Sequence, residues 1–161
     1  MAKNRFPLIA AGVLMGAGLG GFVDGIVFHQ ILQWHNMLSA QMPPNDLVAA
    51  KVNMFWDGIF HAGVWILTVL GLSLLWSSGR RDDVPWSGRT FLGALLAGFG
   101  LFNLIEGTID HQLLGIHHVY EYADNKLLFD LAFLVAGAIL LIVGAVFIQM
   151  GKNDITRRSE I

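Results

Sequence analysis

The sequence contains no cysteine among its 161 residues, which excludes disulfide bridges and thiolate metal ligands. Charged residues are scarce as well, at 14%, and the net charge is only −2. The chain has no basic patch of the kind that binds nucleic acid. Hydrophobic residues instead make up 55% of the chain, and the mean hydropathy is +0.59. This composition is too apolar for a soluble domain and predicts an integral membrane protein in a lipid bilayer.

Four apolar segments are each long enough to cross a hydrocarbon core of about 30 Å. They cover residues 7–34, 52–76, 90–115 and 127–150. All four are expected to be helices, because a membrane-spanning backbone must satisfy its own hydrogen bonds. The predicted fold class is therefore an all-α bundle of four transmembrane helices.

The distribution of lysine and arginine predicts the orientation of the chain. Basic residues gather near the amino end, in the middle loop and in the tail: Lys3, Arg5, Arg80, Arg81, Arg89, Lys152, Arg157 and Arg158. The other two loops offer only Lys51 and Lys126 near helix ends. Since cytoplasmic loops carry the excess of basic residues, both termini are expected in the cytoplasm.

Two stretches of the chain match each other without a gap. Residues 16–37 read GAGLGGFVDGIVFHQILQWHNM, and residues 98–119 read GFGLFNLIEGTIDHQLLGIHHV. The match pairs Asp24 with Glu106, His29 with His111, and His35 with His117. A carboxylate and two imidazoles kept in phase within apolar helices are costly to bury, which predicts a shared polar site.

The repetition predicts a single membrane domain made of two tandem units. Repeat one covers residues 7–76 and repeat two covers 90–150, joined by a cytoplasmic linker, 77–89, and followed by a cytoplasmic tail, 151–161. Each unit crosses the membrane twice, so both enter in the same direction and are expected to be related by a pseudo-twofold axis along the membrane normal. A shared site is expected on that axis.

Counting about 1.5 Å per residue from the outer helix ends places the ionisable groups of the four segments at similar depths. His29, Asp57, His111 and Asp130 are expected in one layer, and Asp24, His61 and Glu106 in a second layer about two turns deeper. Four carboxylates and three histidines resemble the ligand set of a dinuclear metal site in a four-helix bundle. The seven predicted metal ligands are Asp24, His29, Asp57, His61, Glu106, His111 and Asp130.

The helical periodicity qualifies this ligand set. Asp57 and His61 are four residues apart and share a face with Asn53, which predicts good ligand geometry. Asp24 and His29 are five apart, so an ideal α-helix separates their directions by about 140°, as it does for Glu106 and His111. One residue of each such pair is therefore a candidate for an outer position only. Further candidates for an outer or supporting position are His35, Asn53, Asp110, His117 and His118.

The strings DGIVFHQILQWH, residues 24–35, and EGTIDHQLLGIHHV, residues 106–119, resemble a bacterial group of small predicted membrane proteins catalogued as a domain of unknown function. The resemblance covers nearly the whole chain. It implies a multi-pass protein of the bacterial inner membrane. It also implies a link with respiratory-oxidase assembly, and so a respiratory-chain or metal-delivery partner. It brings no established activity, so no catalytic residue is carried over.

Three functions remain open from the sequence. The first is a metalloenzyme, an oxidoreductase or hydrolase, with iron, copper or zinc in a dinuclear centre. The second is a protein that handles copper or another metal at the outer face, where methionines such as Met37, Met42 and Met54 accompany His35. The third is a haem electron carrier with two axial histidines. A homo-oligomer is compatible with all three.

Overall fold

The computed structural model describes residues 3–158, and within that range the chain is helical without any strand. Four helical segments are long and apolar enough to cross a membrane, which confirms the predicted fold class. In chain order the elements are α1 (Phe6–Val23), η1 (Asp24–Ile31), α2 (Leu47–Gly79), α3 (Gly88–Glu106), η2 (Gly107–Leu113) and α4 (Lys126–Arg158). The elements η1 and η2 are π-helical continuations of α1 and α3.

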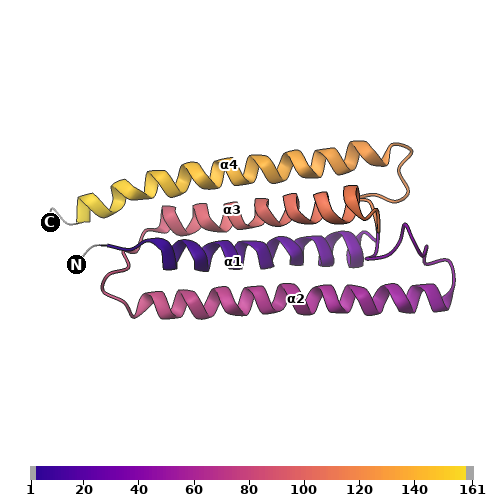
Figure 1. The fold of residues 1–161 in the computed structure, drawn as a ribbon, viewed down its shortest axis with the longest axis horizontal. Helices are drawn as coiled ribbons and strands as arrows, with labels where there is room; N and C mark the ends of the chain where they lie inside the picture. Colours follow the sequence, from indigo (N-terminus) through magenta and orange to yellow (C-terminus); the bar gives the residue numbers. More distant parts are fainter. Residues whose placement is uncertain (1–2, 159–161) are drawn as a thin grey trace.

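The four helices lie side by side in the order α2, α1, α3, α4 (Figure 1). Helix α1 packs on α2 and α3, and α3 packs on α1 and α4, so α1 and α3 form a central pair flanked by the other two. Both ends of the chain lie at one end of the bundle, which we call the termini end (Figure 1). At the opposite end, the loop end, the chain leaves η1 and η2 through residues 32–46 and 114–125.

The central helices touch backbone to backbone through glycine. A Cβ atom at Gly16 would collide with the carbonyl oxygen of Leu95, and one at Gly98 would collide with that of Val13. Val13 lies three residues before Gly16 and Leu95 three residues before Gly98, so the two contacts are reciprocal. Small residues allow such close approach in membranes, and it brings the loop ends of α1 and α3 together.

Capping side chains fix where the helices begin. The Asp46 side chain accepts hydrogen bonds from the backbone N–H groups of Val48 and Ala49 at the start of α2. Ser87 does the same for Thr90 at the start of α3. These bonds satisfy donors that the first helical turn leaves open. The turn between α2 and α3 therefore covers residues 80–87, within the predicted linker 77–89.

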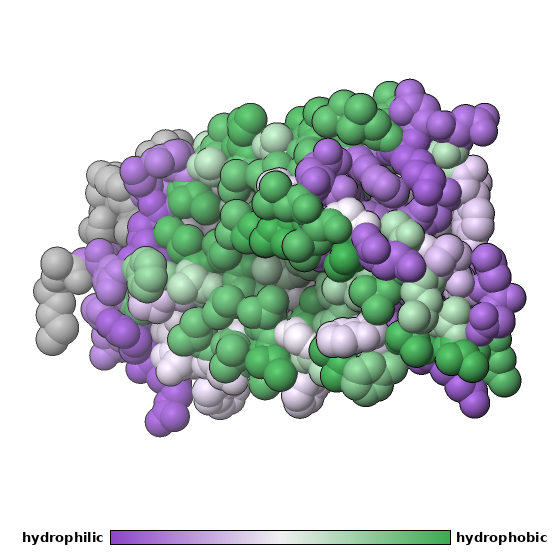
Figure 2. Space-filling model, turned by 45° about the vertical axis from the view of Figure 1, so that its right-hand side comes forward, coloured by the Kyte–Doolittle hydropathy of each residue, from purple (hydrophilic) through white to green (hydrophobic). Residues whose placement is uncertain are grey.

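The surface has the layout of a membrane protein. Figure 2 shows a broad band of hydrophobic residues around the middle of one face, with hydrophilic residues toward both ends. The flanking helices α2 and α4 carry most of the exposed apolar surface. Only 11% of the residues in the most hydrophobic part of α2 are buried, and only 17% in that of α4. Large side chains such as Trp65, Leu72 and Ile142 are more than half exposed, which suits contact with lipid.

The helix ends differ from the predicted segments by a few residues. Regular α-helix ends before residue 24 in the first segment and before residue 107 in the third. The fourth segment continues as α4 beyond its predicted end at residue 150 through Arg158, so the predicted tail starts as helix, and residues 159–161 lie outside the described range. The irregular ends of the first and third segments hold the polar site.

Candidate metal centre

The two π-helical segments bring residues five apart in the sequence onto one face. A π-helix bonds residue i to residue i+5, so it adds about one residue to each turn. In η1, Asp24 Oδ2 lies 3.1 Å from His29 Nε2, and across η2, Glu106 Oε1 lies 2.9 Å from His111 Nε2. The divergence expected for these pairs on an α-helix is therefore wrong, because the local helix is not α-helical.

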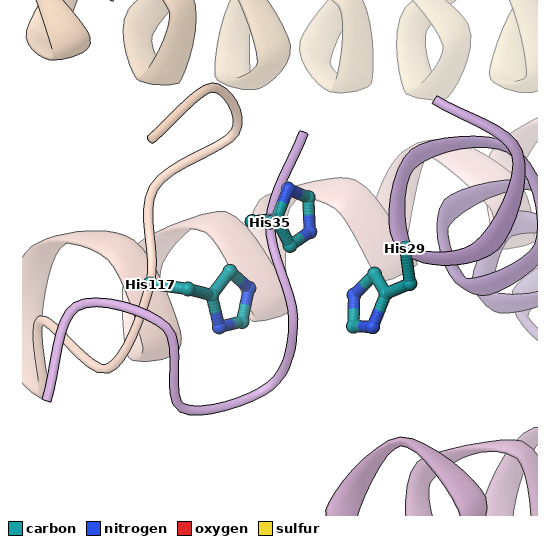
Figure 3. A group of neighbouring side chains, drawn as sticks. All are labelled: His29, His35 and His117. Atoms are coloured by element: carbon teal, nitrogen blue, oxygen red, sulfur yellow. The ribbon is translucent and has the colours of Figure 1, made fainter. Parts of the chain in front are cut away.

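Four histidines gather between the loop ends of the central helices. His29 and His111 come from η1 and η2, while His35 and His117 come from the loops that follow. All four are at most 3% exposed. The rings of His35 and His117 stack with centroids 4.6 Å apart, and those of His29 and His35 are 4.4 Å apart. Figure 3 shows His29, His35 and His117 turned toward one another.

Three of these histidines direct the Nδ1 atom outward to an oxygen atom. His35 Nδ1 lies 2.8 Å from the carbonyl oxygen of Val119, and His117 Nδ1 lies 3.1 Å from that of Met37. His29 Nδ1 lies 3.0 Å from Asp57 Oδ1. Carbonyl and carboxylate oxygens only accept hydrogen bonds, so we assign the proton to Nδ1 in each case. When such a ring is neutral, its lone pair lies on Nε2, on the inner side of the ring.

Asp24 faces the inner nitrogens of the first repeat. Its Oδ2 lies 3.1 Å from His29 Nε2, without hydrogen-bond geometry, and its Oδ1 lies 3.8 Å from His35 Nε2. Burial lowers the pKa of His35 to about 3, with the neighbouring His117 and His29 acting in the same direction. His35 is therefore neutral at physiological pH, which is the form of imidazole that binds metal ions.

Glu106 holds the equivalent place in the second repeat. Its Oε1 lies 2.9 Å from the Nε2 atoms of both His111 and His117. Both ring nitrogens of His117 thus face oxygen atoms, so a proton or a cation must neutralise the contact between Nε2 and Glu106.

Several buried polar atoms of this group have no hydrogen-bond partner within the described part of the chain: Asp24 Oδ1, His29 Nε2, His35 Nε2, Glu106 Oε2, and both ring nitrogens of His111. Buried polar atoms are normally paired, so this concentration of unpaired atoms is compatible with a bound ion. Two overlapping triads each offer three donor atoms within 4.8 Å of one another. One is His29, His35 and His117, and the other is Glu106, His111 and His117.

Asp57 and Asp130 support this group from outside. Asp57 accepts hydrogen bonds from the backbone N–H of Met37 at 2.8 Å and from the Asn36 amide at 2.9 Å, in addition to facing His29. Both of its oxygens are thus engaged. Asp130 accepts from the backbone N–H of Val119 at 2.9 Å and lies 2.7 Å from His118 Nδ1. It lies 3.6 Å from His111 Nδ1, too far for a hydrogen bond, so only Asp57 orients its helix histidine directly.

The structure separates His61 from the other predicted ligands. Its Nδ1 lies 2.7 Å from the backbone carbonyl oxygen of Asp57, one turn earlier in α2, and its ring lies against Gly25. Neither Asp57 nor His61 belongs to the two triads, so their shared ligand stripe stays a prediction. The Asp57 carboxylate faces the loop and η1.

The remaining candidates also have supporting contacts. Asn53 accepts from the backbone N–H of Leu38 at 2.9 Å and donates to the carbonyl oxygen of Met42 at 2.8 Å, so it fixes the loop that carries His35. His118 lies beside Asp130 at the edge of the site, with a side chain 29% exposed. Asp110 lines an apolar groove of about 290 Å³ between α1, α2 and α3, together with Glu106.

The roles of His35 and His117 were not apparent from the sequence. The sequence predicts an outer or supporting position for both, whereas the structure buries them beside His29 and His111. The loops fold back over the ends of η1 and η2, since the backbone N–H of Ala40 bonds to Ile116 and that of Glu121 bonds to Trp34. The one sequence feature that links these histidines to the carboxylates is the spacing of eleven residues, from Asp24 to His35 and again from Glu106 to His117.

Four apolar spans around a buried polar centre define an integral membrane protein of the helical type. A family model described as "Predicted membrane protein (DUF2243)" matches residues 11–151, so the chain belongs to this family. The resemblance drawn from the repeated strings is thereby confirmed. No curated protein and no solved structure matches the chain.

Proposed function

We propose that this protein is a membrane metalloprotein with a dinuclear centre near the loop end of its bundle. The proposed ligands are the four imidazoles and two carboxylates that meet there: Asp24, His29, His35, Glu106, His111 and His117. Asp57 orients His29 from outside the centre, and Asp130 lies behind His111 at 3.6 Å. This set replaces the ligand set expected from the sequence, in which Asp57, His61 and Asp130 bound the metal directly.

The observation that carries the proposal is the orientation of the imidazoles. In metal sites, a ligating histidine almost always donates its other ring N–H to a carboxylate or a backbone carbonyl. His29, His35 and His117 each face such an acceptor through Nδ1 and keep Nε2 toward a carboxylate at the centre. The arrangement occurs in both halves of the site, in His29 and His35 of the first repeat and in His117 of the second.

The charge of the group also supports a metal. Asp24 and Glu106 are at most 6% exposed, and the only groups facing their oxygens in the described structure are imidazoles. Two buried carboxylates without a permanent cation are costly, and divalent metal ions offset that cost. Mixed nitrogen and oxygen donors without sulfur suit iron, zinc and cupric copper.

Two metal ions are proposed because the six donor groups fall into two similar halves, each with one carboxylate and two histidines, and His117 Nε2 binds only one of the ions. The reciprocal glycine contacts of α1 and α3, together with the paired environments of Asp24 and Glu106, support a pseudo-twofold axis through this centre. The two halves differ, since Glu106 belongs to one of the two triads and Asp24 to neither. Such a difference suits a centre in which one ion is held and the other reacts.

Packing argues against haem. The four imidazole rings approach one another with centroid distances from 4.4 to 6.3 Å, and three of the pairs lie within 5 Å. A porphyrin is much wider than an imidazole and would need space between these rings. The rings of His35 and His117 already stack on each other with an interplanar angle of 7°. Bare ions fit between donor atoms without displacing the rings.

We further propose that the loop end faces the periplasm of a bacterial inner membrane. The basic residues Lys3, Arg5, Arg80, Arg81 and Arg89 lie at the termini end, which the positive-inside rule assigns to the cytoplasm. The centre would then work on the outer side as an oxidoreductase or a hydrolase. A second candidate, metal handling for another protein, is favoured by Met54, a soft ligand that lines a cavity next to His29.

Elemental analysis of the protein purified in detergent tests the proposal. We expect about two equivalents of a transition metal per chain, and loss of at least one in His35→Ala and in His117→Ala. His61→Ala is the matched control, since it removes a membrane histidine outside the group and should retain the metal. A metal-free wild-type protein from metal-supplemented cells would contradict the proposal, as would equal metal content in all three variants.

A further inference from the structure

A polar cavity of about 400 Å³ reaches the proposed centre from the loop end of the bundle. Its lining includes His29, Gln30, Gln33, Asn36, Met54 and Tyr122. His29 is 1% exposed, and its Nε2 has no hydrogen-bond partner in the described residues. The cavity therefore ends at a histidine of the proposed centre.

The amide groups in this cavity are oriented by Asp57. The Asn36 amide nitrogen donates to Asp57 Oδ2 at 2.9 Å, and the Gln30 amide nitrogen lies 3.5 Å from the same oxygen. Because the nitrogens are held in this way, the carbonyl oxygens of both amides remain available to another partner. Neutral carbonyl oxygens are ligands that replace the hydration water of a cation while binding it weakly enough to release it.

Gln33 lies in the cavity at a conformational cost. It has a φ of 52° in the left-handed region, which favours glycine. The corresponding residue of the second repeat is Gly115, with a φ of 55°. The same left-handed turn is therefore unstrained in the second repeat, where the residue is glycine, and strained in the first, where it carries a side chain. A non-glycine residue kept in a strained conformation points to a role for its side chain.

We propose that this cavity is the path by which a divalent metal ion passes between the outer aqueous phase and the centre. The amide oxygens of Gln30, Gln33 and Asn36 replace the ion's water in turn and deliver it to His29. The inference rests on the proposed function, because it requires a metal centre at the end of the path. It adds the side from which the metal arrives and the residues that it meets first.

The rate of metal uptake tests the path. The full chain in detergent micelles is stripped with a chelator and mixed with Co²⁺, and binding is followed by visible absorption. Ala50→Trp fills the cavity from α2, and we expect it to slow uptake at least tenfold at unchanged final stoichiometry. Ala62→Trp is the matched control, because Ala62 is exposed on the same helix away from the cavity, and its uptake should equal that of the wild type.

Gln33→Gly gives an independent test, since glycine suits the backbone at this position and the variant should fold. We expect slower uptake from the loss of one amide oxygen, again with full final stoichiometry. Wild-type rates in both Ala50→Trp and Gln33→Gly would overturn the path while leaving the metal centre intact. A wild-type protein that binds no Co²⁺ at all would instead contradict the proposed function, so the two failures are distinguishable.

Discussion

His29 Nε2 lies 3.1 Å from Asp24 Oδ2, although the two residues are five apart in the sequence. The contact exists because Asp24 opens the π-helical segment η1, in which each turn contains about one residue more than in an α-helix. Glu106 and His111 repeat the relationship across η2 at 2.9 Å. π-Helical turns are uncommon and concentrate at functional sites, so their presence in both matching stretches agrees with the proposed centre.

Replacing Asp57 with Asn should weaken metal binding without abolishing it. The Asp57 carboxylate orients His29 through Nδ1 and does not face the centre, and loss of such an outer partner typically costs about 10- to 100-fold in affinity. Competition with a chelator of known affinity measures the change. Asp83→Asn at the termini end is the control and should bind like the wild type. An Asp57→Asn protein with wild-type affinity would refute the orienting role.

Gly16→Ala should destabilise the bundle, because its Cβ would collide with the Leu95 backbone oxygen between α1 and α3. Overpacking of this kind typically costs about 1–3 kcal/mol. Thermal unfolding in detergent measures the loss. Gly58→Ala in α2 is the matched control, because a Cβ there meets no atom within 4 Å, and it should be neutral or stabilising by up to about 1 kcal/mol. Equal melting temperatures for the two variants would contradict the close helix contact.

Two single substitutions, Gln33→Gly and Gly115→Gln, should have opposite effects on the free energy of unfolding. Gln33→Gly relieves a left-handed backbone and should leave the free energy of unfolding unchanged or raised, whereas Gly115→Gln should lower it by about 1–2 kcal/mol. Chemical unfolding of the two variants beside the wild type measures the difference. If Gln33→Gly were the less stable variant, the strain at Gln33 would not be real.

Asn53→Ala should loosen the loop that carries His35. The Asn53 side chain bonds to the backbone of Leu38 and Met42, and its loss leaves buried groups unpaired at a cost of about 1–3 kcal/mol. We expect faster proteolysis within residues 37–46 and weaker metal retention. Ser73→Ala, which removes only an exposed bond within α2, is the control. Unchanged cleavage in Asn53→Ala would show that other contacts hold the loop.

The sequence repeat identified residues that the structure brings close together. The repetition of Asp24 as Glu106, of His29 as His111 and of His35 as His117 marked all six residues now proposed as ligands. Their grouping was not predictable from helical periodicity, because that reasoning assumes 3.6 residues per turn throughout. It favoured Asp57 with His61, neither of which belongs to the two triads of donor atoms.

The sequence alone determined that the chain forms four membrane helices, because long apolar runs in lipid must satisfy every backbone hydrogen bond within the helix. It also determined which residue types are repeated. Only the tertiary structure decided which atoms meet. The π-helical turns set the direction of His29 and His111, and the close approach of α1 and α3 through Gly16 and Gly98 lets the returning loops insert His35 and His117 between them. Those contacts depend on local helix pitch and on packing between distant segments, which no pattern of neighbouring residues specifies.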